Sequence, residues 1–232
     1  MTITADHGYD DLPRLMSRMT GDEKHDFAAT STLDVLWMLY DRVLDVTPER
    51  AEAPDRDRFL LSKGHGPMAY YAVLAAKGFV PEEWLPGFGS YDSPLGHHPD
   101  RVLVPGAEIG SGSLGHGLPL AVGGALGLRA QGLTDPAVWV LIGDAELDEG
   151  SNHEAIAYAG AAGLDRLHTV VVDNASASHA LPGGIAARFE AANWSTATVD
   201  GRDHAALYEA FTAPHPGRPH AVVARVEPKN AR

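Results

Sequence analysis

Apolar residues in the second half of the chain recur with two alternating periods. Short apolar runs at 137–142, 168–173, 195–199 and 220–225 have the length and composition of β-strands. The segments before and between them, at 118–130, 151–162, 185–192 and 205–211, have the spacing of helices. Strands that alternate with helices through short connections form a parallel sheet covered on both faces. The pattern therefore predicts an α/β fold with a doubly wound parallel sheet flanked by helices.

The first 50 residues are expected to add helices to this sheet, within one domain over 1–232. One helix is predicted where apolar residues share a helical face, at Leu12, Leu15, Met16 and Met19. A second is predicted to begin at Ser31, because Ser31 and Asp34 have capping-box spacing ahead of an apolar face. Residues 58–61 fit a strand, 62–67 a turn, and 68–77 a helix that ends at Gly78.

The segment 81–112 is predicted to be a long irregular connection, since it is rich in proline and glycine. Aromatic and apolar residues argue against disorder there, and His97 and His98 lie near its middle. Long loops in compact domains usually carry function. We therefore expect this connection to contribute to a site.

Composition narrows the class of protein. Lys and Arg number 18 against 31 Asp and Glu, and the formal net charge of −13 disfavours nucleic-acid binding. The absence of cysteine excludes disulfides, thiolate metal sites and cysteine nucleophiles. The start of the sequence is polar and acidic, unlike a secretory signal, and the strand-like apolar runs are too short to cross a bilayer. We expect a cytoplasmic protein that binds neither membranes nor nucleic acid.

Polar side chains follow two of the predicted strands. Asp144 comes directly after the apolar run 138–143, and Asn174 follows the run 169–173, 30 residues later. Either residue alone could simply end a strand. One strand–helix–strand unit separates them, however, so they can be neighbours at the edge where parallel sheets bind ligands. Carboxylate and amide oxygens suit Mg²⁺, and the predicted start of a helix near Ser151 suits a diphosphate.

Two other interpretations of this region fail. A calcium loop beginning at Asp144 would need Gly where Glu149 stands and Glu where Ala155 stands. The segment 110–115 matches the glycine pattern of dinucleotide-binding folds, but the residues before it make a poor strand, and Asp135 precedes the next strand instead of ending one.

Several segments together resemble the transketolase family. Gly143-Asp144-Ala145 followed by Asn174 is similar to the thiamine-diphosphate signature, and GDAELDEGSNHEA resembles its transketolase version. In chain order, the other resembling segments are KHDFAATSTLDVLWMLY, LSKGHGPMAYYAVLAAKGF, SPLGHHPDR and GSGSLGHGLPLAVGGALG. The resemblance covers about residues 20–226 and only the N-terminal, diphosphate-binding portion of the family.

The resemblance implies the N-terminal subunit of a split transketolase, with thiamine diphosphate and Mg²⁺ as cofactors. Its activity would be transfer of a two-carbon ketol unit from a ketose to an aldehyde. A C-terminal subunit with the pyrimidine-binding domain would complete the enzyme, as an α2β2 heterotetramer. A large apolar patch is then expected around the GSLGHG segment. The alternatives are an α-subunit of a 2-oxo acid dehydrogenase and a non-catalytic scaffold partner.

The resemblance also implies roles for individual residues. Mg²⁺ would be held by Asp144, Asn174 and the backbone carbonyl of Ser176. The cofactor would be bound by residues of four segments, with Glu149 at the subunit interface: His65, Gly112, Ser113, Leu114, Gly143, Ala145, Glu149 and Asn174. The substrate channel would be lined by three histidines, His25, His65 and His98.

The sequence also departs from the family pattern. Ala145 replaces the third glycine of the signature, so its methyl group would crowd the phosphate if its φ were positive. Lys24 stands where a glycine is usual, and a late loop with a further histidine is missing. These departures predict an altered substrate pocket.

Overall fold

Five strands, all parallel, form one sheet in the order β1-β2-β3-β5-β4. They are β1 (Arg58–Leu61), β2 (Val138–Gly143), β3 (Leu167–Asp173), β4 (Ser195–Asp200) and β5 (His220–Arg225). The structure is a computed structural model that describes residues 7–20, 26–179 and 182–228. It confirms the predicted α/β fold with a parallel sheet.

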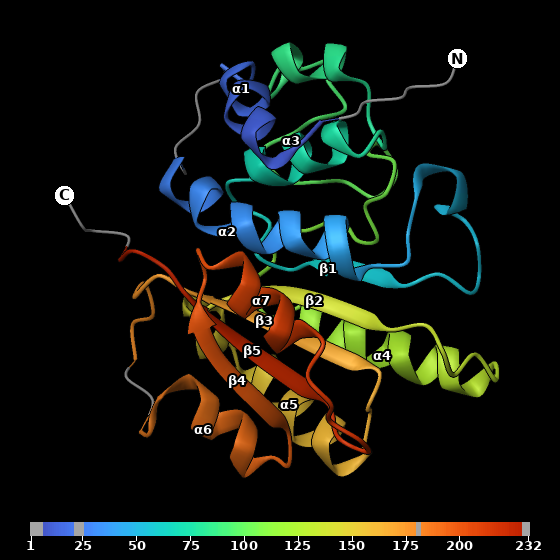
Figure 1. Cartoon of the computed structure of the whole chain (residues 1–232), viewed down its shortest axis with the longest axis vertical. Coiled ribbons are helices and arrows are strands. Elements are labelled where there is room, and N and C mark those ends of the chain that lie inside the picture. Colours follow the sequence, from blue (N-terminus) through green and yellow to red (C-terminus); the bar gives the residue numbers. More distant parts are fainter. Residues whose placement is uncertain (1–6, 21–25, 180–181, 229–232) are drawn as a thin grey trace.

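Helices cover both faces of the sheet (Figure 1). One face packs against α1 (Leu12–Ser17), α2 (Asp26–Met38), α3 (Met68–Ala76) and α7 (His204–Phe211). The other packs against α4 (Gly117–Ala130), α5 (Gly150–Ala161) and α6 (Gly184–Ala191). Successive side chains of a strand point to opposite faces, so Trp139 and Leu141 join the first core while Val138, Val140 and Ile142 join the second.

Shorter helical turns connect these elements. The 3₁₀ turns are Tyr9–Asp11, Pro48–Arg50, Glu82–Gly87 and Ala145–Asp148, and a π-helical turn at Leu39–Val43 continues α2. From residue 117 onward, every strand and α-helix begins and ends within one residue of the sequence prediction. None of the helices in the described ranges is long and apolar enough to cross a membrane.

The predicted start of the second helix was wrong. Helix α2 already includes Asp26, and Ser31 lies inside it, buried, instead of capping it. Ala28 and Ala29 favour helix formation, so the chain is helical before the capping-box pattern is reached. The buried residues Ser31, Thr32 and Asp34 belong to a helix that lies against α3 and α7.

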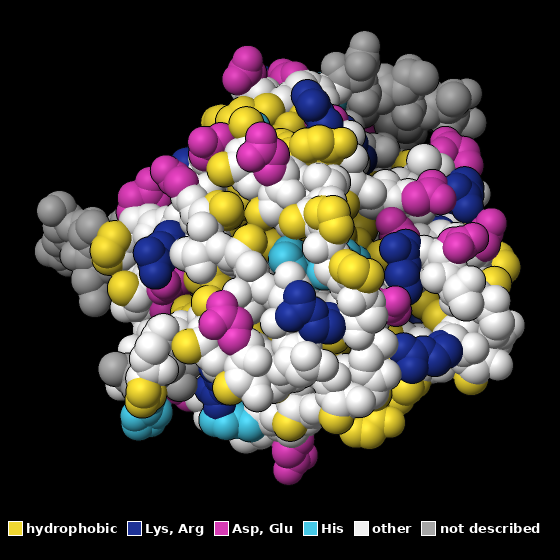
Figure 2. Space-filling view, turned by 60° about the horizontal axis from the view of Figure 1, so that its bottom comes forward, with side chains coloured by type: hydrophobic (Ala, Val, Ile, Leu, Met, Phe, Trp, Pro, Cys, Tyr) yellow, Lys and Arg dark blue, Asp and Glu magenta, His cyan; other side chains and the backbone are white. Residues whose placement is uncertain are grey.

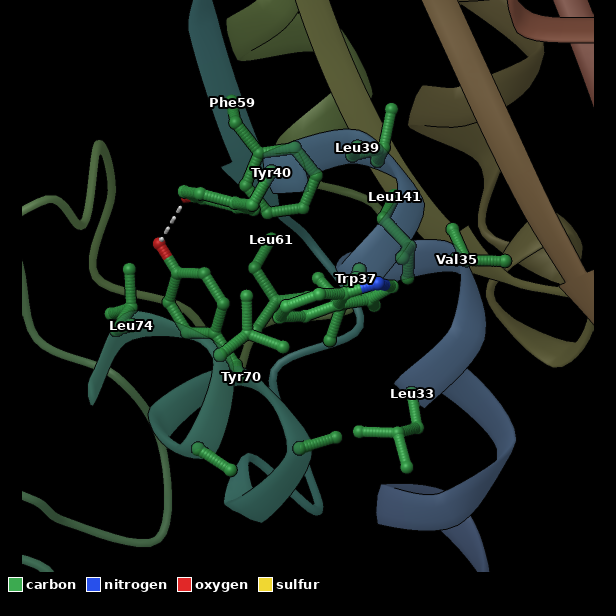
Figure 3. Close-up of a cluster of buried hydrophobic side chains, with 14 of the residues drawn as sticks. Leu33, Val35, Trp37, Leu39, Tyr40, Phe59, Leu61, Tyr70, Leu74 and Leu141 are labelled. Carbon is green, nitrogen blue, oxygen red and sulfur yellow. Dashed lines mark hydrogen bonds between the residues drawn. The ribbon is translucent and has the colours of Figure 1, made fainter. Parts of the chain in front are cut away.

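The N-terminal helices and β1 share an aromatic core (Figure 3). The ring of Tyr40 meets Phe59 edge-on at 5.5 Å, and its hydroxyl lies 3.3 Å from that of Tyr70. The Tyr70 hydroxyl also reaches the backbone oxygen of Gly106, at 3.2 Å. This contact anchors the long connection 81–112, whose apolar side chains Leu85, Phe88, Leu95 and Val104 are buried. The connection is irregular, as predicted, but it packs against the core.

Candidate functional site

The two polar residues singled out by the sequence follow neighbouring strands at one edge of the sheet. Asp144 directly follows β2 and Asn174 directly follows β3, and these strands are paired neighbours in the sheet. The backbone amide of Asp144 donates to the carbonyl of Val172 at 3.1 Å, so the ladder continues up to the site. Both side chains are buried. The fold therefore brings a carboxylate and a carboxamide to the same edge of the sheet.

The Asp144 carboxylate organises the loop after β3. It accepts hydrogen bonds from the backbone amide and hydroxyl of Ser176, both at 2.6 Å, and from the amide of Ala177 at 3.0 Å. Between Asn174 and Ser176, Ala175 has a φ of +54°, a left-handed conformation that non-glycine residues rarely adopt. Such strain persists where the surrounding contacts hold it, and it is typical of functional loops.

The Asn174 side chain leaves a polar atom unpaired. Its Oδ1 is buried and has no hydrogen-bond partner among the described residues. A buried oxygen without a partner, at the sheet edge that also carries the Asp144 carboxylate, suits a hard cation such as Mg²⁺. The described part of the chain contains no group of three or more His, Asp or Glu side chains that could hold a metal ion. A metal here would therefore need amide or backbone oxygens, as in the predicted set Asp144, Asn174 and Ser176.

A hollow of about 450 Å³ opens beside Asp144 at this edge of the sheet. Asp148, Asp173, Ser178 and Arg225 are among the residues that line it. The backbone amide of Ser178 donates to Asp148 at 3.2 Å. The hollow is therefore bordered by the ends of β2, β3 and β5, where parallel sheets bind ligands.

Ala145 does not strain the backbone. It begins the 3₁₀ turn Ala145–Asp148, and among the described non-glycine residues only Ala175 and Asn193 have positive φ. The glycine that the family pattern places at this position is therefore not required by the backbone conformation.

Three segments that the sequence analysis singled out contact one another, and they contain Gly64, His98 and Gly112. A Cβ atom added to Gly64 would lie 2.2 Å from Oγ of Ser111, and one added to Gly112 would lie 3.0 Å from the ring of His98. Gly112 also has a φ of +121°, which favours glycine. His65 follows Gly64 and is half-buried, whereas His98, Ser113 and Leu114 are exposed. The structure thus brings His98 and the residue that precedes His65 to the same glycine-rich segment. His25 lies outside the described residues.

Glu146 is a functional candidate that the sequence analysis missed. Its carboxylate is only 1% exposed and accepts hydrogen bonds from the Ser62 hydroxyl, from the Gly115 amide at 2.9 Å and from the Gly143 amide at 3.3 Å. Burial raises the pKa of Glu146, while these hydrogen bonds and nearby Lys63 oppose that rise. Four of the six residues at 144–149 are acidic, a composition typical of an exposed turn. No periodic pattern in the sequence therefore indicated a buried carboxylate at position 146.

Glu149, predicted to lie at the subunit interface, is exposed and packs against Gly115. A Cβ atom on Gly115 would lie 2.7 Å from Cβ of Glu149. The hydroxyl of Ser151 donates to the carbonyl of Gly115 at 2.7 Å. The start of α5 is therefore fixed to the segment that precedes α4.

Comparison with known proteins decides the family. The model of the family described as "Transketolase, thiamine diphosphate binding domain" matches residues 19–225. The chain belongs to the transketolase family, as its thiamine-diphosphate-binding domain.

Relatives of this transketolase-family chain carry different names. It is 57% identical over 224 residues to "Ferredoxin fas2" of Rhodococcoides fascians, covering 97% of this chain and 74% of that protein. It is 37% identical over 210 residues to one of the subunits of the apulose-4-phosphate transketolase of Actinobacillus succinogenes, covering 86% of this chain and 75% of that protein.

Solved transketolases share the fold. The transketolase of Campylobacter jejuni superposes with a TM-score of 0.75 at 24% identity, over 97% of this chain and 38% of that one. The transketolase of Leishmania mexicana gives the same TM-score over 94% of this chain and 36% of its own. The transketolase-family chain thus spans little more than a third of these solved enzymes.

Proposed function

We propose that this chain is the N-terminal subunit of a two-component transketolase. It would bind the diphosphate of thiamine diphosphate through Mg²⁺ and take part in moving a two-carbon ketol unit from a ketose to an aldehyde. The observation that carries the proposal is the Asp144–Asn174 pair. A buried carboxylate and an amide oxygen without a partner among the described residues follow neighbouring strands at one sheet edge, inside a thiamine-diphosphate-binding domain.

Oxygen donors at the ends of β2 and β3 would hold the metal. We assign Asp144, Asn174 and the backbone carbonyl of Ser176 to Mg²⁺, which prefers hard oxygen ligands and usually completes its shell with phosphate oxygens and water. The Asp144 carboxylate already fixes the loop at 176–177. The same side chain thus orders the loop that carries the proposed Ser176 ligand.

Backbone groups and glycines would hold the rest of the cofactor. Gly143 and the amide of Ala145 would face the diphosphate, since they adjoin Asp144. Gly112, Ser113 and Leu114 would lie toward the aminopyrimidine, where glycine lets the backbone approach closely. Thiamine diphosphate, when bound, supplies an electron sink for cleavage of the bond next to a ketone.

Histidines would handle substrate hydroxyls and protons. The His98 ring lies against Gly112, and Gly64, which precedes His65, lies against Ser111. A histidine can exchange protons near neutral pH. We assign His65 to both cofactor and substrate, and His98 and His25 to the substrate channel.

The proposed partner is a C-terminal subunit that carries the pyrimidine-binding domain, in an α2β2 assembly. Relatives in Actinobacillus succinogenes and Phocaeicola vulgatus are named as individual subunits of apulose-4-phosphate transketolases. Apolar side chains on both sides of the segment 115–117 are exposed, Leu114 to 40% and Leu120 to 52%. On the face in Figure 2, apolar side chains lie in small groups among charged ones. Exposed apolar residues next to a cofactor site suit contact with a partner.

Other functions receive less support. A non-catalytic scaffold would be favoured if Ala145 crowded the phosphate, but its backbone φ is not positive. One relative is named a ferredoxin, but this chain contains no cysteine, the residue whose thiolate holds iron–sulfur clusters.

The proposal is tested by assaying purified chain with Mg²⁺, thiamine diphosphate and a panel of ketoses and aldehydes. The assay is run with and without the proposed C-terminal subunit, which we expect to be encoded by a neighbouring gene. We expect ketol transfer only with both polypeptides. Robust transfer by the single chain would refute the two-component proposal, and no cofactor binding by the assembled pair would favour a scaffold.

A further inference from the structure

We propose that Glu146 is a positioning residue for the cofactor site. Its buried carboxylate ties together the three glycine-bearing segments that would surround thiamine diphosphate. The inference rests on the function proposed above, because that function assigns the cofactor to these segments. Glu146 itself is not among the residues that line the hollow beside Asp144, so it would act through its hydrogen-bond partners.

The donors to the Glu146 carboxylate come from separate parts of the chain. Oε1 accepts from the hydroxyl of Ser62, at the end of β1, and from the amide of Gly115, which precedes α4. Oε2 accepts from the amide of Gly143, the last residue of β2. These donors lie 84, 31 and 3 residues away in sequence. One carboxylate therefore fixes the spacing between the ends of two strands and the start of a helix.

Ser62 extends this network to α4. Its Oγ accepts from the amide of Gly117 at 3.0 Å while its hydroxyl donates to Glu146. A Cβ atom at Gly117 would lie 2.1 Å from Cβ of Ser62, so the helix begins in direct contact with the serine. Ser62 thus links the first turn of α4 to Glu146.

Asn152 extends the network to α5. Its Nδ2 donates to the backbone carbonyl of Glu146 at 2.6 Å, and Asn152 is fully buried. The turn that carries Glu146 is therefore held from α5 as well. Because α5 begins next to Glu149 and α4 next to Gly115, the network sets the relative placement of both helix starts.

A buried acceptor is needed at this position. The amides of Gly115 and Gly143 and the hydroxyl of Ser62 are donors in a region closed to water, and a buried donor without an acceptor is unfavourable. An apolar side chain at 146 would leave all three without this partner. Neither Asp148 nor Glu149 can replace it, because Asp148 accepts from Ser178 and Glu149 is exposed.

The test compares Glu146→Ala, Glu146→Gln and Ser62→Ala with a control, Glu209→Ala, which removes an exposed glutamate from α7. Each full-length chain is studied with the C-terminal subunit. Calorimetry measures the affinity for thiamine diphosphate with Mg²⁺, and hydrogen-exchange mass spectrometry measures protection of peptides covering 111–117 and, as a reference, β3 and β5.

We expect Glu146→Ala to weaken cofactor affinity by about tenfold or more, as loss of supporting contacts to a metal site typically does. Exchange should rise in 111–117 while β3 and β5 stay protected. Glu146→Gln should restore part of both properties, because its Oε1 can still accept from Ser62 and Gly115. Ser62→Ala should show a smaller loss, and Glu209→Ala should match the wild type.

Cofactor affinity within twofold of wild type for Glu146→Ala, with unchanged exchange in 111–117, would overturn the inference. If Glu146→Ala does not fold, wild-type affinity and exchange in Glu146→Gln and Ser62→Ala would overturn it instead. Absence of cofactor binding by the wild-type pair would refute the proposed function, and exchange in 111–117 would then decide the positioning role alone.

Discussion

Among single residues, Asp144 has both a structural and a proposed chemical role. Its carboxylate accepts three hydrogen bonds from Ser176 and Ala177, which fix a loop that contains the left-handed residue Ala175. Carboxylate oxygens can take more than one partner each, so capacity remains for a cation. The loop and the proposed metal site therefore depend on the same side chain.

We predict that Asp144→Ala lowers the Mg²⁺-dependent affinity for thiamine diphosphate by more than about 100-fold, since losing even an outer partner of a metal site costs 10–100-fold. Isothermal calorimetry on the assembled enzyme measures the effect. The matched control is Asp148→Ala, which removes a carboxylate four residues later and should cost far less. An affinity for Asp144→Ala close to that of the wild type would refute the metal assignment.

Helix α5 shows how one element is fitted to its neighbours. The indole nitrogen of Trp194 donates to the carbonyl of Ile156 at 2.9 Å, so the turn between α6 and β4 is fastened to α5. This close approach requires a glycine at position 160. A Cβ atom there would lie 1.6 Å from the backbone oxygen of Ala192. A backbone atom cannot move aside as the end of a flexible side chain can, so a methyl group at this position would force the two segments apart.

Gly160→Ala is therefore expected to lower the free energy of unfolding by about 1–3 kcal/mol, the usual cost of overpacking. Urea denaturation of the isolated chain measures it. Gly123→Ala is the matched control, because Gly123 lies in α4 with no atom within 4 Å of its added Cβ. There the better helix propensity of alanine should leave stability unchanged or raise it by up to about 1 kcal/mol. Equal effects of the two substitutions would contradict the packing argument.

Across the whole molecule, the two ends of the sheet differ in chemistry. The carboxyl end carries the proposed cofactor site, whereas histidines gather at the opposite end. His168 lies in β3 and His220 begins β5, both buried, and the ring of His215 lies 4.8–4.9 Å from each of them. His168 also stacks on Trp139 at 4.0 Å. The hollow beside this cluster is also lined by the charged residues Asp57, Asp165 and Arg166.

Two of these histidines, His168 and His220, have a lowered pKa in the folded protein. Burial, and then repulsion between a protonated His168 and the neighbouring His215, His220 and Arg166, keep the pKa of His168 well below its usual 6.5. Burial also lowers the pKa of His220, although its Nε2–H donates to the carbonyl of Ala210 and opposes that shift. Among the described residues, Nδ1 of either ring has no partner, so a proton placed there would gain no hydrogen bond.

Because the folded state binds fewer protons than the unfolded chain, stability from this cluster is present above pH 6.5 and is lost as the pH falls below that value. Each such histidine should cost up to about 1.4 kcal/mol per pH unit. Chemical denaturation between pH 7.5 and 5 measures this. His168→Phe should flatten the dependence, whereas His179→Gln, at an exposed position, should not. An unchanged slope for His168→Phe would contradict the prediction.

The sequence alone determined most elements and located two candidate site residues at one edge of the sheet. Buried positions recur along a strand or helix with that element's own period. The strands and helices after residue 117 could therefore be located from the spacing of apolar residues. Asp144 and Asn174 could be paired because consecutive parallel strands bring their carboxyl ends to one edge. The resemblance to transketolases, carried by several segments, is confirmed by the family match over 19–225.

Only the tertiary structure decided the rest. The insertion of β5 between β3 and β4 leaves no local signal, because strand order depends on contacts distant in sequence. Helix α2 includes Asp26 although a capping pattern stands at Ser31, which lies buried inside the helix, against neighbouring helices, instead of at its start. Glu146 lies among acidic residues that suggest an exposed turn, yet it is buried because donors from Ser62, Gly115 and Gly143 converge on it. A buried polar group requires partners, and those partners are supplied by the fold, far along the chain.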